Sequence, residues 1–121
     1  MKVQMREIIQ AIPALSKITG GDLSLRLAYQ LKKNIAELQK EADFFSEQRQ
    51  KIFDKYGTPK EDGTYSFAAE KEQEAIHELE ALLDLEVTPE AEALEIPVTE
   101  NLHISVNDIG LLMPFIHFIE E

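Results

Sequence analysis

Three histidines, His77, His103 and His117, are the side chains of this chain that titrate near neutral pH. His77 follows Glu74 at the i, i+3 spacing that carboxylate and imidazole ligands have in di-iron helical bundles. Such a centre needs two of these motifs and two further inward-facing glutamates, and the other expected helices contain no second motif. His103 and His117 lie in apolar surroundings without a paired glutamate. We therefore expect no metal and no other cofactor.

Nucleophilic catalysis also lacks a sequence signature. It requires a Ser, Thr or Cys activated by a neighbouring base, and the chain has neither a Cys nor a G-x-S-x-G turn. The turn Gly20-Gly21-Asp22 lacks the lysine and the further glycine of a phosphate-binding P-loop. We expect that the protein is not an enzyme and that it has no catalytic residues.

Charge is distributed very unevenly along the chain. Residues 1–60 carry 11 Lys/Arg against 7 Asp/Glu, whereas residues 61–121 carry Lys71 against 16 carboxylates. Cations and anions alternate along the expected second helix, which is typical of a solvated helix and predicts no direct nucleic-acid binding. The acidic half allows an alternative function, the occupation of a basic groove on a host nucleic-acid-binding enzyme through the carboxylates between Glu70 and Glu100.

The first half of the chain predicts two helices. Apolar residues at helical spacing indicate a short helix over residues 4–19, which Gly20-Gly21 stops and which Pro13 kinks or delays. Asp22 or Ser24 can cap the second helix. Its seam follows a heptad repeat in which the polar exception is Arg49: Ala28, Leu31, Ile35, Leu38, Ala42, Phe45, Arg49, Ile52 and Tyr56. A helix that continues to Tyr56 is ~50 Å long and exceeds the ~35 Å diameter of a compact chain of this size, so it must protrude or meet a partner.

The segment after Tyr56 predicts a turn and a third helix. Gly57, Pro59 and Gly63 indicate a turn with a short extended arm. The third helix, over residues 67–86, has a narrow apolar stripe and needs a helical neighbour. The short connection favours an antiparallel hairpin with the second helix, in which Lys51, Lys55 and Lys60 lie near the acids of the third.

The last third of the chain predicts strands and a final helix. Proline residues and short β-branched segments between residues 85 and 105 indicate two strands. Ser105 can cap a helix over residues 106–120 that has no polar face, and Pro114 within it puts its continuity in question. A helix that is apolar all round is buried in a core or in an interface.

Together these patterns predict a mainly α fold in a single domain, residues 1–121. We expect an N-terminal helix and turn (1–22), a long antiparallel helical hairpin (23–86), and a small irregular or β segment followed by a hydrophobic C-terminal helix (87–121). The apolar stretch from Ile109 to Ile119 is too short to span a bilayer, and Arg6 and Glu7 interrupt any signal peptide. We therefore expect no membrane association and, with no Cys, a cytoplasmic protein.

Several segments resemble small acidic helical proteins encoded by bacteriophages and prophages. They are the run Leu23 to Asn34, the segment Leu82 to Val87, and the closing stretch Asn107 to Glu121. The resemblance covers most of the chain and implies a bacterial or phage cytoplasmic setting. It transfers no catalytic residue, because the function of these proteins is unassigned.

The most economical hypothesis is a non-enzymatic protein that acts through protein–protein association, including self-association, in an assembly or structural role. The apolar C-terminal stretch and the seam of the second helix are the expected contact surfaces. The residues that we expect to carry them are Phe115, Ile116, Phe118, Ile119, Leu31, Ile35 and Leu38.

Overall fold

The computed structural model describes residues 2–19, 23–97 and 104–120. Within them the chain is mainly helical, with α1 (Met5–Thr19), α2 (Leu25–Tyr56), α3 (Ala69–Leu83) and α4 (Val106–Leu112). The strands β1 (Val3–Gln4), β2 (Gly57–Pro59), β3 (Tyr65–Phe67), β4 (Glu86–Val87), β5 (Leu94–Pro97) and β6 (Ile116–Ile119) form two-stranded sheets. The expected stop at Gly20-Gly21, the alternative cap Asp22, and His103 lie outside the described residues.

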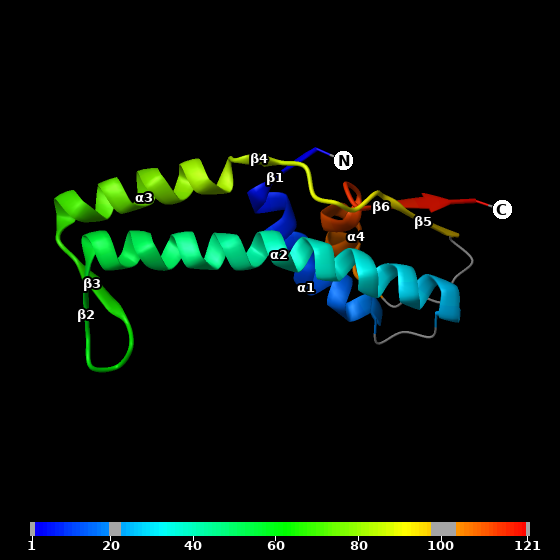
Figure 1. Cartoon of the computed structure of the whole chain (residues 1–121), viewed down its shortest axis with the longest axis horizontal. Helices are drawn as coiled ribbons and strands as arrows, with labels where there is room; N and C mark the ends of the chain where they lie inside the picture. The colour runs from blue at the N-terminus through cyan, green and yellow to red at the C-terminus, as the bar shows by residue number, and fades with distance from the viewer. Residues whose placement is uncertain (1, 20–22, 98–103, 121) are drawn as a thin grey trace.

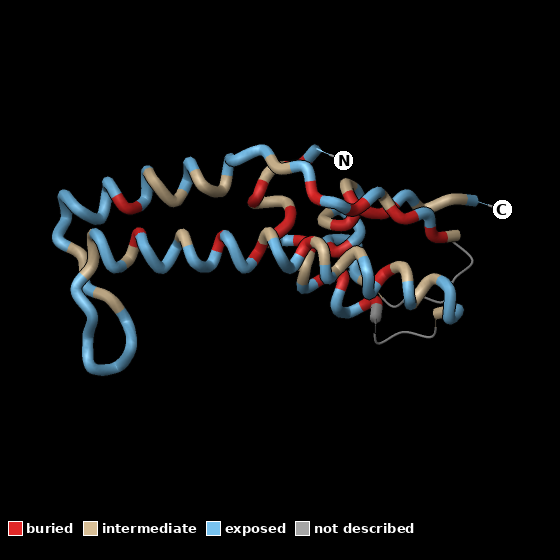
Figure 2. The backbone as a smooth tube through the Cα atoms, in the orientation of Figure 1, coloured by how far each residue is buried: buried red, intermediate tan, exposed pale blue. Residues whose placement is uncertain are grey.

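The molecule is elongated, with its core at one end (Figure 1). We call that end the head; it comprises β1, α1, the N-terminal half of α2, α4, β5 and β6. Its buried side chains form one hydrophobic cluster: Val3, Ile8, Ala11, Ala14, Leu15, Ile18, Leu31, Leu38, Leu94, Ile96, Leu112, Phe115 and Ile116. Figure 2 shows the concentration of buried residues in the head and their scarcity at the other end.

The prediction of a long second helix is confirmed. Ser24 caps α2, because its hydroxyl oxygen accepts a hydrogen bond from the backbone N–H of Leu27 at 3.4 Å. The heptad seam is buried or half-buried along α2 apart from Arg49, which is exposed. The 32 residues of α2 give a rod of ~48 Å that extends well beyond the head (Figure 1).

The first helix is also confirmed, and it anchors α4. Pro13 lies inside α1, which begins at Met5 without delay. Ser105 caps α4 as predicted by accepting a hydrogen bond from the N–H of Asp108 at 3.1 Å. The buried Asp108 carboxylate also lies 3.2 Å from the ammonium of Lys17 in α1, and this hydrogen-bonded cation lowers the pKa of Asp108.

Beyond the head, α3 lies beside the C-terminal half of α2 (Figure 1). We call this pair of segments, α2 from Ala42 onward and α3, the stalk. Its buried residues are Ala42, Phe45 and Ile52 on α2 and Ala75 on α3. The ammonium of Lys55 lies 3.3 Å from a carboxylate oxygen of Glu78, which confirms the predicted contact between Lys55 and the acids of the third helix.

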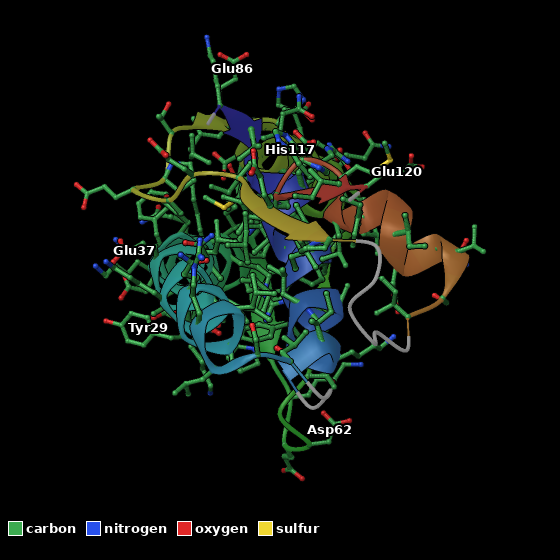
Figure 3. The ribbon with its side chains drawn as sticks, turned by 90° about the vertical axis from the view of Figure 1, so that its right-hand side faces the viewer. Tyr29, Glu37, Asp62, Glu86, His117 and Glu120 are labelled. Atoms are coloured by element: carbon green, nitrogen blue, oxygen red, sulfur yellow. The ribbon has the colours of Figure 1, made fainter. Side chains whose placement is uncertain are left out.

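A β-hairpin of β2 and β3, which we call the tip, ends the stalk. The two strands pair antiparallel, so the extended arm predicted after Tyr56 is confirmed. Gly63 adopts a φ of 86° in the turn, a backbone conformation that favours glycine. A Cβ on Gly57 would lie 2.8 Å from the carbonyl oxygen of Phe53 and 2.9 Å from the ring of Phe67, so the junction requires glycine. Figure 3 shows Asp62 at the end of this hairpin, away from the helices.

The predicted C-terminal helix over residues 106–120 is wrong beyond Leu112. α4 ends there, and Ile116–Ile119 form β6, which pairs in parallel with β5 in the register Leu94 to Ile116. Pro114 explains the break, because it has no N–H to donate and its ring crowds the preceding turn of a helix. The segment is not an unpartnered surface either: Leu112, Phe115 and Ile116 are in the core of the head.

Of the two expected strands between residues 85 and 105, the structure places one at β5 and one at β4. β4 pairs antiparallel with β1 near the start of the chain, with Val3 opposite Val87. The guanidinium of Arg6 binds the carboxylates of Glu80 and Asp84 in the same region, and these contacts raise the Arg6 pKa. The N-terminal end of the chain thus fastens the C-terminal end of α3 to the head.

Candidate interaction surface

The seven apolar residues expected to bind a partner are packed in the head. Leu31, Leu38, Phe115 and Ile116 are buried, Ile35 and Phe118 are partly buried against the same core, and Ile119 is half-buried. Contacts within one chain account for their burial. The surface considered below for association is therefore a different one.

Glu74 and His77 line a shallow, open hollow on α3. Its volume is about 530 Å³, and its other walls come from Tyr56, Glu70, Gln73 and Glu78. Both Glu74 and His77 are exposed to solvent. Among the residues that the structure describes, no group of three or more His, Cys, Asp or Glu side chains could hold a metal ion.

The stalk carries an apolar groove that the chain leaves open. We call it the stalk groove; its volume is 140 Å³, and it is lined by Phe53, Phe67, Glu72, Ala75, Ile76 and Leu79. Ile76 is 53% exposed although it is one of the largest apolar side chains of α3. Two packed helices cover each other only along their line of contact. Apolar side chains at the edges of each helix's apolar stripe therefore stay exposed to solvent. The groove lies along one of these edges.

The aromatic end of the groove is held rigidly by the tip. The rings of Phe53 and Phe67 meet edge to face at a centroid distance of 5.8 Å, and Tyr65 packs 5.6 Å from Phe53. The Tyr65 hydroxyl donates a hydrogen bond to Asp54 at 2.8 Å and accepts one from Gln50 at 2.6 Å. The bond to the Asp54 carboxylate raises the pKa of Tyr65, because ionisation of the phenol would place two negative charges together. The groove is therefore preformed at this end.

Two charged side chains lie at or near the groove. On α2, the guanidinium carbon of Arg49 lies 5.7 Å from the centroid of the ring of Phe53, which lines the groove. On the α3 wall, Glu72 lines the groove directly. Neither side chain belongs to an ion pair within the described part of the chain. Both charges are therefore available to a partner.

Sequence reasoning missed this groove, although its signals were present. Phe53 and Phe67 flank the Gly57–Gly63 turn, so a hairpin there brings the two rings together. Ile76 follows Ala75 in the stripe of the third helix and lies at the edge of that stripe. A pattern of this kind does not tell how much of the stripe a single neighbouring helix can cover.

Within the described residues, no helix is both long enough and apolar enough to cross a membrane. No family model, no curated protein and no solved structure matches this chain.

Proposed function

We propose that this protein acts without catalysis, by protein–protein association through the stalk, in an assembly or structural role. The observation that carries the proposal is the stalk groove, an apolar surface on an extended arm far from the core of the head. Exposed apolar patches of this kind are typical of sites that bind other proteins. The resemblance to phage and prophage proteins supports a bacterial or phage cytoplasmic setting.

The proposal includes the antiparallel helical hairpin of α2 and α3. The Lys55–Glu78 ion pair supports it, because it joins the last turns of α2 to the middle of α3. The attachment of Arg6 in α1 to Glu80 and Asp84 supports it further, since it draws the end of α3 back towards the head. In such a hairpin the tip is the point farthest from the head, where a partner meets the least obstruction.

The shape of the stalk argues for binding rather than for internal stability alone. Most of the stability of a helix in a protein comes from packing of its apolar face, and α3 has Ala75 as its buried residue. A partner that covers Ile76 and Leu79 would complete this packing. The apolar residues of the stalk would therefore be better packed with a partner bound than in the free protein.

The test is site-specific photocrosslinking in cells that express the chain. A photoreactive phenylalanine analogue replaces Ile76 in one variant and Glu74 in the matched control, which lines the separate hollow with Tyr56. We expect a discrete crosslinked species from position 76 and none from position 74. Crosslinks of equal yield from both positions, or none from position 76, would refute binding at the groove. Crosslinks from position 74 alone to a nucleic-acid-binding enzyme would favour the alternative function of the acidic half.

A further inference from the structure

The stalk groove has room for one large apolar side chain. Its volume of 140 Å³ is close to that of an apolar cavity of ~150 Å³ that holds a benzene molecule. The rings of Phe53 and Phe67 border the groove on one side, and the apolar face of α3 borders it on the other. A leucine or phenylalanine side chain from a partner would cover Ile76, which is 53% exposed in the free chain.

The α3 wall of the groove has the spacing of a helix-packing face. The residues of this wall are Glu72, Ala75, Ile76 and Leu79. They stand at positions i, i+3, i+4 and i+7, so their side chains lie on one face of α3. A groove between two helices receives a third helix through apolar side chains that recur every three to four residues. The partner segment that fits this groove is therefore an amphipathic helix.

The charge at the groove favours a basic segment. Glu72 is one of five glutamates on α3, which carries a single lysine. Glu78 and Glu80 are paired with cations of other elements, whereas Glu72 has no ion pair within the described residues. Arg49 stacks on the ring of Phe53 outside the lining of the groove, so it leaves the Glu72 carboxylate uncompensated. The net charge of −11 over the whole chain also attracts a cationic partner.

We infer that the occupant of the stalk groove is a basic amphipathic helix of another protein, which inserts a large apolar side chain beside Ile76 and places a lysine or arginine against Glu72. The inference rests on the proposed function and names the chemistry of its partner. Because Glu72 lies one turn from Ile76 towards the tip, the partner's cation stands three or four residues from its apolar anchor. A second copy of this chain is disfavoured, because two chains of net charge −11 repel each other.

The experiment is a selection from a displayed library of helix-forming peptides of about four turns, roughly 14 residues, against the full chain. The library varies one helical face among large apolar, basic, acidic and small polar residues. We expect the enriched peptides to carry a lysine or arginine three or four residues from a large apolar residue. Synthetic copies of these peptides should bind Ile76→Ser about tenfold more weakly than the wild type, because the variant removes the apolar contact. Circular dichroism verifies that this variant folds.

The variant Glu72→Lys tests the charge at the groove. A selection repeated on this variant should enrich aspartate or glutamate where the wild type enriches a cation. The peptides selected on the wild type should bind Glu72→Lys about fivefold more weakly or worse. Glu74→Lys is the matched control, because it makes the same change in charge on α3 but lines the other hollow. It should select the same basic peptides as the wild type and bind them within about twofold of its affinity.

Several results would overturn the inference. They are enriched peptides without a basic preference, a basic preference that persists on Glu72→Lys, equal weakening by Glu72→Lys and Glu74→Lys, affinity that does not depend on Ile76, and a selection that enriches no peptide. Photocrosslinking from position 76 then separates the two proposals. A crosslink to an acidic or non-helical segment of another protein, or to a second copy, would leave the proposed function intact, whereas the absence of any crosslink would remove both.

Discussion

Truncation of Phe115 to alanine measures how far the C-terminal segment belongs to the core. Phe115 is 3% exposed and packs in the hydrophobic cluster of the head. Replacement of a buried phenylalanine by alanine costs about 3–5 kcal/mol, through lost burial and the cavity left behind. A chain of this length has a free energy of unfolding of about 6–18 kcal/mol. The substitution should therefore remove at least about a sixth of the total stability, and most of it if the stability lies at the low end of that range.

Urea unfolding followed by circular dichroism provides the assay. With a slope of about 2 kcal/mol per molar urea, the midpoint should fall by about 1.5–2.5 M. Met113→Ala is the control in the same segment, because Met113 is 63% exposed and its truncation should change stability by less than about 0.5 kcal/mol. The reasoning fails if Phe115→Ala costs less than about 1 kcal/mol. It also fails if the loss appears only at low protein concentration, as expected for an interface residue.

Two further predictions concern the tip and the attachment of α4. Gly57→Ala should loosen the tip, because the new methyl group would lie 2.8 Å from the carbonyl oxygen of Phe53 and 2.9 Å from the ring of Phe67; faster amide hydrogen exchange in residues 57–67, with little change in the head, would verify this, and unchanged exchange would contradict it. Asp108→Asn should lower the melting temperature more at pH 6 than at pH 3. The hydrogen bond from Lys17 lowers the folded-state pKa of Asp108 below its ordinary value of 3.8, so its stabilising effect is present above that value and disappears as the pH falls through the folded-state pKa. An equal difference in melting temperature at both pH values would rule out this linkage.

Local sequence signals predicted the elements that begin or end at a capping residue, a glycine or a proline. The long helix α2 follows from an apolar repeat without glycine or proline, between a serine cap and Gly57. The tip follows from Pro59 and Gly63, which favour a turn between short extended segments. The Lys55–Glu78 contact follows from the short connection between α2 and α3, because a short connection places α3 beside α2.

The remaining features depend on contacts between distant parts of the chain. The run Ile116–Ile119 is as apolar as a buried helix, and its strand conformation depends on pairing with β5, about twenty residues earlier. Likewise, the pattern around Leu31 and Leu38 reveals that these side chains are buried, but it does not reveal whether their neighbours belong to the same chain. The stalk groove is the converse case, an apolar pattern that internal packing covers only in part.

The head is built from the two ends of the chain, while the stalk and tip come from its middle. Ile18 of α1 and Phe115 of the core lie about a hundred residues apart, which takes a ribosome about 5–20 s to synthesise. Throughout that interval the apolar face of α1 has no access to β6 or α4. The arm that we propose to bind a partner is therefore synthesised before the segments that close the head.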